Sequence, residues 1–401
     1  MQSTQSPASP IASPAEVSTH LTWQENGHTC EDKWRSERGA PVPKRVVLAD
    51  DTLSADSAYR LACAGTGMLW RGDFQNARLL LQALARRCDA PKKVRRASKT
   101  HPEVAHTPQE NFHLHRQAQS QRARTLSMIL IQINPDRQIS LRRAPDWRVA
   151  MKEAWGPAGT QGCITSLREL LGLVGAHEWH EKGMEISALG STPHNRIHPS
   201  YGVFSPVRGE YIQLVADAPL PDSALAFDIG VGTGVLSAVL VKRGVKRVVG
   251  TDLDPRALAC AKENIQRLGL SDRVELLQTD LFPQGKAPLV VCNPPWLPAR
   301  ASAPIERAIY DENSAMLKGF LAGLAAHLTP KGEGWLILSD LAEHLGLRTR
   351  AELEAWIASA GLKVIGKIDT KAEHKKAMDE SDPLHAARAA EVTSLWRLNI
   401  A

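Results

Sequence analysis

Residues Ala224–Gly234 read ALAFDIGVGTG: an apolar run, an acid at Asp228, and glycines at Gly230, Gly232 and Gly234. The apolar run predicts a buried strand. Glycines at alternate positions let the backbone turn tightly and admit a ligand against it. A dinucleotide-binding fingerprint would need the spacing G-x-G-x-x-G, which this stretch does not have. An acid two residues ahead of the first glycine disfavours a pyrophosphate and suits a ligand that carries an ammonium group.

From Pro219 onwards the sequence alternates between strand and helix patterns. This alternation predicts an α/β fold with an open, mostly parallel sheet that helices cover on both faces. Ligands bind such sheets at the carboxyl ends of the strands, where the strand order reverses. The last two strands can pair antiparallel. We expect strands at residues 224–230, 246–252, 272–280, 287–295, 332–340, 362–370 and 393–400.

The second and third of these strands each end in an acid, Asp252 and Asp280. An acid about 20 residues after the glycines can accept hydrogen bonds from ribose hydroxyls. Asp280 can accept from an adenine amino group while the Leu281 backbone N–H donates to the ring. S-adenosylmethionine fits the description of a ligand with an ammonium, a ribose and an adenine but no phosphate. We predict that it is bound by Asp228, Gly230, Gly232, Gly234, Asp252, Asp280, Leu281 and Asn293.

The fourth strand ends in Asn293-Pro294-Pro295-Trp296. Proline fixes φ near about −65° and removes an N–H, so the Asn293 side-chain oxygen and the Pro294 carbonyl are held as two acceptors. They can polarise a planar –NH₂ group and aim its lone pair at a methyl group, while Trp296 stacks on the substrate. We predict that these four residues are catalytic and that no metal takes part. The alternative is a rigid strand exit with a core tryptophan.

DIGVGTG, GTDLDPRAL, TDLF and VVCNPPW resemble, in order and spacing, the class I S-adenosylmethionine-dependent methyltransferases. The resemblance covers residues 202–400 and implies a doubly wound, seven-stranded Rossmann-like sheet with the residue roles given above. The NPPW motif is similar to that of enzymes that methylate planar nitrogens. Two groups are closest: HemK-type glutamine methyltransferases of release factors, and ribosomal RNA guanine enzymes of the "methyltransferase small" type. Pro206, Arg208 and Glu210 stand at shifted spacing from the HemK segment Pro-Arg-Pro-Glu-Thr-Glu.

The chain divides into three expected regions: a disordered tail at 1–40, a basic and mainly helical substrate-recognition domain at 41–195, and the methyltransferase domain at 196–401. Within the second region we expect a helix at 73–87 with Asp73 as its N-cap and another from Ser166. We also expect a polar linker at 91–110 and a β-hairpin at 127–143.

Charge in the second region favours an RNA partner. Residues 86–148 contain fourteen Lys and Arg against five Asp and Glu, whereas the whole chain carries only +6. A phosphate backbone is the natural partner of such a segment, although charge runs are often simply solvated. RNA, ribosomal RNA in particular, is therefore slightly favoured over a release-factor glutamine. A third hypothesis is a catalytically silent RNA-binding subunit.

The rest of the sequence predicts a cytoplasmic protein that does not bind membranes. Six cysteines are scattered without a CxxC pair, and no apolar run approaches the roughly 20 residues that span a bilayer. The first residues lack the features of a signal peptide. The sequence does not fix the oligomeric state.

Overall fold

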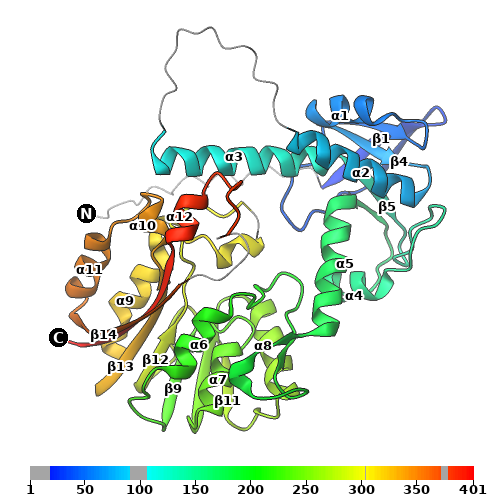
Figure 1. Cartoon of the computed structure of the whole chain (residues 1–401). Coiled ribbons are helices and arrows are strands. Elements are labelled where there is room, and N and C mark those ends of the chain that lie inside the picture. Colours follow the sequence, from blue (N-terminus) through cyan, green and yellow to red (C-terminus); the bar gives the residue numbers. More distant parts are fainter. Residues whose placement is uncertain (1–18, 91–105, 303, 372–377) are drawn as a thin grey trace, which may run out of the picture.

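The computed structural model describes residues 19–90, 106–302, 304–371 and 378–401, which form two α/β units. A short two-stranded sheet, β7 (Met184–Glu185) with β8 (Arg196–Ile197), lies in the segment between them. Figure 1 shows the first unit at the upper right and the second at the lower left, with α3 (Pro108–Leu126) running across the top from one to the other. No helix among the described residues is both long and apolar enough to cross a membrane.

The second unit is built on a seven-stranded sheet with the order β11-β10-β9-β12-β13-β15-β14. β15 runs antiparallel to both of its neighbours, β13 and β14, and all other neighbouring strands are parallel. The strand order reverses between β9 and β12, where a ligand site is expected. This topology confirms the predicted fold. The strands are β9 (Leu225–Ile229), β10 (Arg247–Asp252), β11 (Val274–Gln278), β12 (Ala287–Cys292), β13 (Leu328–Ser339), β14 (Leu362–Lys371) and β15 (Val392–Ile400).

Helices cover both faces of this sheet, and each face has its own apolar core. The helices α6 (Gly209–Asp217), α7 (Val235–Lys242) and α8 (Pro255–Arg267) pack on one face. The helices α9 (Ala315–His327) and α11 (Arg350–Ser359) pack on the other. Every residue of α7 except Lys242 is buried, as expected for a helix that is apolar all round. The short helices α10 (Leu341–His344) and α12 (His385–Ala390) contact each other.

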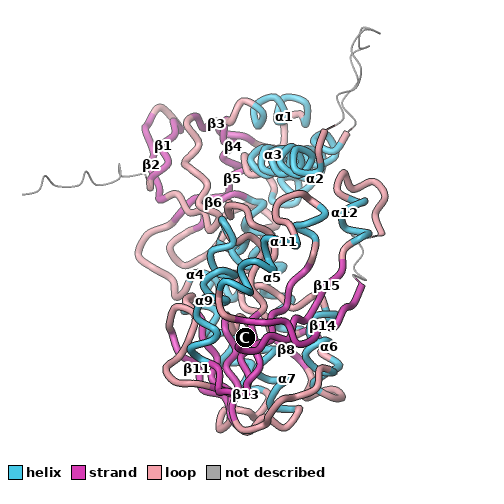
Figure 2. Tube along the Cα trace, turned by 90° about the vertical axis from the view of Figure 1, so that its left-hand side faces the viewer, coloured by secondary structure: helices cyan, strands magenta, loops and turns pink. Residues whose placement is uncertain are grey.

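The first unit contains a four-stranded sheet with the order β3-β4-β5-β6, in which β6 is antiparallel to β5 and the other pairs are parallel. Helices pack on one face, and the hairpin of β1 with β2 packs on the other (Figure 2). These elements are β1 (His20–Glu25), β2 (His28–Lys33), β3 (Arg45–Ala49), β4 (Thr66–Trp70), β5 (Ile129–Ile133), β6 (Cys163–Ser166), α1 (Ala55–Cys63), α2 (Phe74–Asp89), α4 (Arg148–Trp155) and α5 (Leu167–Lys182).

The helices predicted in this unit are confirmed, including their caps. The Asp73 side chain accepts from the Gln75 N–H at the start of α2, and the Ser166 side chain accepts from the Glu169 N–H at the start of α5. The parallel sheet itself was not indicated by the sequence patterns. Of the predicted linker at 91–110, residues 91–105 lie outside the described part of the chain.

Two expectations for the first unit are wrong. Residues 20–33 form a hairpin instead of part of a disordered tail, because Leu21 and Trp23 alternate with polar residues and bury against the sheet. Residues 1–18 lie outside the described ranges. The predicted hairpin at 127–143 is also absent: β5 pairs with β4 and β6 instead. Its residues are apolar on both faces, which suits a central strand.

Candidate active site

The sheet brings the predicted strand ends to one edge. Thr251, one residue before the end of β10, pairs with Ile229 at the end of β9, and Cys292 at the end of β12 pairs with the same Ile229. On the outer side, Asp252 pairs with Gln278 at the end of β11. The glycine loop, Asp252, Asp280 and the NPPW motif therefore follow four adjacent parallel strands, as the sequence predicts.

The loop after β9 needs its glycines. Gly230, Gly232 and Gly234 have φ of 76°, 53° and 80°, the left-handed region that side chains disfavour. The N–H groups of Gly230 and Val231 donate to the Thr251 carbonyl, so the loop is bound to β10. A Cβ built on Gly232 would meet only the Gly230 carbonyl, at 3.9 Å. The loop therefore forms an open backbone cradle.

Asp228 lies beneath this loop rather than on its surface. Its side chain is 1% exposed, and its Oδ2 accepts from the Ser237 hydroxyl at 2.6 Å. Burial raises the pKa of this carboxyl from 3.8 to about 6, although the hydrogen bonds from Ser237 oppose the shift. Because an ionised, buried carboxylate is costly, Asp228 holds the loop against α7 at the expense of stability.

Asp228→Asn is expected to stabilise the fold at neutral and alkaline pH. The folded-state pKa lies above the unfolded one, so the contribution of Asp228 is most favourable below about pH 4 and is lost as pH rises through about 6. The shift corresponds to about 3 kcal/mol. The variant should melt at a higher temperature than wild type at pH 8, with the difference vanishing near pH 4. Parallel melting curves across this range would contradict the assignment.

Asp252 connects the cradle to the strand end. Its Oδ2 accepts from the Gly232 N–H at 3.0 Å, and its Oδ1 accepts from the Asp254 N–H at 3.0 Å. Each carboxylate oxygen keeps a further lone pair, so both can also accept from ribose hydroxyls. Burial raises the pKa of Asp252. The next residue, Leu253, is 66% exposed. It is a large apolar side chain directly after Asp252, and the sequence patterns did not indicate it.

The third strand end carries a second unusual backbone position. Leu281 has φ of 60° although it is not glycine, and the Thr251 hydroxyl donates to its carbonyl. Such backbone strain is kept where the surrounding structure fixes it, often at functional sites. The Asp280 side chain is exposed and makes no hydrogen bond or ion pair with the described residues. The contacts of Asp280 and of the Leu281 backbone with an adenine stay predictions.

The NPPW motif is held together by its own side chains. The Trp296 indole N–H donates to the Asn293 Oδ1 at 2.9 Å. This bond fixes the Asn293 side chain and leaves one lone pair on its oxygen for a substrate. Pro294 is buried, and Trp296 is partly buried. The guanidinium of Arg208 lies 4.8 Å from the centre of the Trp296 ring, so a base cannot stack on that part of the ring.

Arg208 links this motif to the start of β15 and, through Glu391, to the end of β13. Its Nη1 donates to Glu391, the residue before β15, at 2.9 Å, and its Nε donates to Glu210 at 2.7 Å. Glu391 has a fully buried side chain and also accepts from Ser339, at the end of β13. A cation beside an aromatic ring is attracted to its face. Arg208 is therefore a positioning residue for Trp296, and through it for Asn293.

Arg208→Met is expected to lower kcat about tenfold while the affinity for S-adenosylmethionine stays near that of wild type, because misplacing Trp296 disturbs only the substrate side. Stability should fall by about 3 kcal/mol, since Glu391 loses its charged partner in a buried place. Arg208→Lys should recover part of kcat. The measurements are steady-state kinetics, calorimetry and thermal unfolding.

A matched control is available in Arg243, which lies 5.7 Å from the Trp335 ring and donates to the Val215 carbonyl. Arg243→Met removes a comparable arginine–tryptophan contact away from the motif. It should lower stability without changing kcat of the folded enzyme. An equal loss of kcat in both variants would show that Arg208 acts only through stability.

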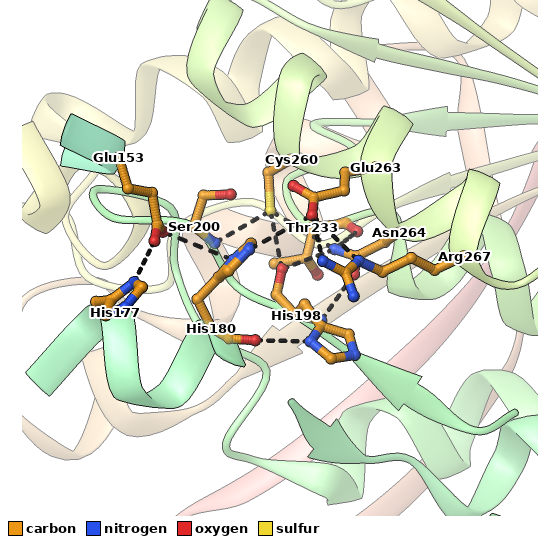
Figure 3. Close-up of polar contacts among 10 residues, drawn as sticks. All are labelled: Glu153, His177, His180, His198, Ser200, Thr233, Cys260, Glu263, Asn264 and Arg267. Carbon is orange, nitrogen blue, oxygen red and sulfur yellow. Dashed lines mark hydrogen bonds and ion pairs between the residues drawn. The ribbon is translucent and has the colours of Figure 1, made fainter. Parts of the chain in front are cut away.

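A second polar network ties the cofactor loop to the first unit (Figure 3). The buried Asn264 of α8 donates to the carbonyls of Thr233, in the glycine loop, and of His198, and its oxygen accepts from the His198 N–H. His198 in turn contacts the His180 carbonyl at the end of α5. His180 is itself buried, 3.4 Å from Glu263. No group of His, Cys, Asp or Glu among the described residues is arranged to hold a metal ion.

The segment after the motif is held by α3. Phe112 of α3 packs with Leu297 in one apolar cluster. Arg116 donates to the Arg300 carbonyl at 2.6 Å and lies 4.1 Å from the Tyr310 ring centre. The first unit therefore shapes the chain that leaves the NPPW motif, which sequence patterns did not indicate.

Five of the described arginines in the basic segment of the first unit are paired with carboxylates. Arg87 pairs with Asp56, Arg122 with Asp89, and Arg148 with Asp146. Arg142 and Arg143 both bind the buried Asp73. The five cations Lys92, Lys93, Arg95, Arg96 and Lys99 lie outside the described ranges. The simple count of charges over 86–148 therefore overstates the free positive charge.

Comparisons with known proteins support the cofactor side of this site. Residues 213–294, about a fifth of the chain, match the family model of ribosomal protein L11 methyltransferases. The ribosomal protein L11 methyltransferases of Escherichia coli O1:K1 and Shigella boydii serotype 18 are each 32% identical over 137 residues. That stretch is 34% of this chain and 44% of either relative, so the chain spans less than half the length of the curated relatives it matches.

Solved methyltransferase structures resemble this chain only with low sequence identity and low TM-scores. A ribosomal protein L11 methylase of Lactobacillus delbrueckii subsp. bulgaricus is 17% identical with a TM-score of 0.36, covering 52% of this chain and 88% of that one. A tRNA methyltransferase of B. subtilis is 14% identical with a TM-score of 0.33, covering 48% and 66%. A Thiobacillus denitrificans methyltransferase in complex with S-adenosyl-L-homocysteine is 16% identical with a TM-score of 0.35, covering 50% and 95%. Overlaps this low support no argument about this chain.

The strand order, the glycine loop and the family match together define a class. The chain carries an S-adenosylmethionine-dependent methyltransferase domain with the seven-stranded sheet, and S-adenosylmethionine is its cofactor. The family match ends at Pro294, inside the NPPW motif. It therefore includes the strand ends that are predicted to bind the cofactor and leaves out Pro295, Trp296 and the chain that follows them.

Proposed function

We propose that this chain is an N-methyltransferase that methylates a planar –NH₂ group of an RNA base, with ribosomal RNA as the favoured substrate. The observation that carries the proposal is the fixed pair of acceptors in the NPPW motif. Asn293 Oδ1 is oriented by the Trp296 indole at 2.9 Å, and the Pro294 carbonyl is held by the buried proline. The hypothesis of a catalytically silent RNA-binding subunit is disfavoured, because the complete motif is preserved beside a complete cofactor loop.

The residues present fit S-adenosylmethionine. The left-handed glycines leave an open cradle, Asp252 keeps lone pairs for the ribose hydroxyls, and Leu253 and the Leu281 backbone flank the place for a base. When bound, the cofactor supplies an electrophilic methyl group on a sulfonium. The remaining requirement is a correctly placed nitrogen lone pair, and that is the role we assign to the NPPW motif.

Asn293 Oδ1 and the Pro294 carbonyl each accept one N–H of the substrate –NH₂ group. Two acceptors draw electron density toward the nitrogen and stabilise the positive charge that develops on it during transfer. They also orient the lone pair toward the methyl group. No general base is required before transfer, because the extra proton leaves the methylated nitrogen for solvent afterwards.

RNA is favoured by the surroundings of the motif. Arg300 and Arg307 follow it in sequence, and both side chains are exposed and unpaired among the described residues. Exposed arginines in the segment that follows the motif suit a phosphate backbone. The proposed substrate-recognition role of residues 41–195 rests on α3, which supports this segment through Phe112 and Arg116.

A protein substrate is the second candidate, because the matched relatives are named as ribosomal protein L11 methyltransferases. A glutamine side chain of a release factor, the HemK-type reading, presents a similar planar amine. The substrate side of the site does not choose between these two protein substrates. The family match stops at Pro294, and Arg208 contacts Trp296 and Glu391.

The test uses the full chain, methyl-labelled S-adenosylmethionine, and ribosomes from cells in which the gene is deleted. After the reaction, one portion is treated with RNase and another with protease. We expect label that is released by RNase and resists protease. Label that stays in protein after RNase treatment would refute the RNA assignment and support the second candidate. Asn293→Ala protein serves as the background control.

A further inference from the structure

Asn264, in the third turn of α8, is a fully buried asparagine whose side-chain amide is hydrogen-bonded at both ends (Figure 3). Its Nδ2 donates to the carbonyls of Thr233 and His198, both at 3.1 Å. Its Oδ1 accepts from the His198 N–H at 2.7 Å. Because an amide has two N–H donors, both of these donors have a carbonyl acceptor. The side chain therefore holds two separate stretches of backbone in a fixed relation.

The first of these stretches is the glycine loop, which α8 approaches closely. A Cβ built on Gly234 would lie 3.3 Å from the Ala261 Cα, so a side chain there would press against the helix. Asn264 follows Ala261 by three positions, on the same face of α8, and its amide reaches the Thr233 carbonyl. On the other side of the loop, Asp252 accepts from the Gly232 N–H at 3.0 Å. Asn264 thus fixes the loop from α8 as Asp252 fixes it from β10.

The second stretch is the segment after β8 that holds His198, and it contacts both units. The Ser200 N–H donates to the Cys260 Sγ of α8 at 3.3 Å. The Nδ1 of His198 lies 2.6 Å from the His180 carbonyl in the last turn of α5. The Tyr201 side chain packs against the apolar core of the first unit. A continuous set of hydrogen bonds therefore runs from α5 through His198 and the Asn264 amide to the glycine loop.

We propose that Asn264 is a positioning residue for the cofactor loop, and that through His198 it makes the affinity for S-adenosylmethionine depend on the first unit. With the Thr233 carbonyl bound to the amide, the glycine-rich backbone on either side has less freedom to rotate. A loop that is already ordered loses less conformational entropy when it binds a ligand. The proposal concerns the cofactor side alone, so it goes beyond the proposed function and holds whether RNA or protein is methylated.

The first experiment measures the affinity of Asn264→Asp for S-adenosyl-L-homocysteine by calorimetry at about pH 8. The substitution keeps the size of the side chain and the acceptor for the His198 N–H but removes both donors. We expect the affinity to fall about tenfold, the effect of one hydrogen bond lost from the support of the loop. Asn195→Asp is the matched control, because Asn195 is also buried and donates to the Gly190 carbonyl at 3.0 Å. Wild-type affinity in Asn264→Asp, or equal losses in both variants, would overturn the proposal.

The pH dependence of Asn264→Asp separates positioning from packing. At lower pH the introduced carboxyl becomes protonated and regains an O–H donor. The ratio of variant to wild-type affinity should therefore rise towards one as the pH falls from about 8 to about 5. A ratio that stays constant across this range would mean that the variant only loosens packing, which contradicts the proposal. The titratable neighbours are present in both proteins and are Cys260, Glu263, His180 and His198.

His198→Ala tests the connection to the first unit and remains informative if Asn264→Asp does not fold. It removes the ring beside the His180 carbonyl and leaves the backbone groups that Asn264 binds. We expect a loss of affinity for S-adenosyl-L-homocysteine of about threefold, smaller than that of Asn264→Asp because the loop keeps its direct contact. His177→Ala is the control, since His177 contacts Glu153 within the first unit, and it should bind like wild type. Wild-type affinity in His198→Ala, with thermal unfolding showing a folded protein, would overturn the dependence on the first unit.

Discussion

Asn293→Ala is expected to lower kcat by a factor of about 10² to 10³ while the affinity for S-adenosylmethionine stays near that of wild type. The magnitude is that of losing one preorganised polar partner of a transition state. Asn293 stands at the end of β12, with its oxygen fixed by the Trp296 indole at 2.9 Å, and none of its described contacts reaches the glycine loop. The measurements are single-turnover methyl transfer and calorimetric titration of the cofactor.

Because Asn293 and Trp296 are hydrogen-bonded to each other, Asn293→Ala also frees the indole N–H. Trp296→Phe separates the two effects: it keeps an aromatic ring and removes only the donor, so it should cost less than Asn293→Ala. Asn399→Ala is the control for an asparagine away from the site, since Asn399 donates to the Gly332 carbonyl. Full turnover of Asn293→Ala would eliminate the orienting role of the motif.

Asp252→Ala is expected to weaken S-adenosylmethionine binding about 100-fold. Two charge-assisted hydrogen bonds to ribose hydroxyls would be lost, at about 1.5 kcal/mol each by a low estimate. Asp252 also holds the Gly232 and Asp254 N–H groups at 3.0 Å, so the cradle would loosen as well. Calorimetry with S-adenosyl-L-homocysteine gives the affinity without turnover.

Asp254 offers a matched control two residues away. Its side chain accepts from the Arg256 N–H at 2.9 Å and caps α8. Asp254→Ala should therefore cost about 1 kcal/mol of stability and leave cofactor affinity nearly unchanged. If the two variants lost affinity equally, the ribose assignment of Asp252 would be untenable and the effect would belong to the start of α8.

The methyltransferase half could be predicted because its signals are local. Alternating strand and helix patterns, the alternate glycines and the prolines of Pro294-Pro295 each fix backbone geometry within a few residues. Parallel pairing then carries Asp228, Asp252 and Cys292 to a common edge without further information. The cap at Asp254 follows equally from short-range chemistry.

The contacts that complete the site come from distant parts of the chain, so no short pattern contains them. Arg208 and Glu391 are 183 positions apart in the sequence, and Arg116 and the Arg300 carbonyl are 184 apart. The sheet and the ion pairs of the first unit were also harder to predict from sequence. Its sheet uses short strands such as β6, whose apolar runs are too brief to show a period. Its basic segment looked unpaired because its partners, Asp56 and Asp73, precede it in sequence.

The anchoring of α3 has a consequence for how this protein could have changed over time. Phe112 shares one apolar cluster with Leu297, Leu341 and Leu345, so part of the catalytic unit's interior belongs to the other half of the chain. A fragment starting near residue 196 would expose that cluster and release the segment after the motif. The two halves are thus not interchangeable modules. A different first unit could be combined with this methyltransferase domain only if it supplied a helix that packs against the same cluster.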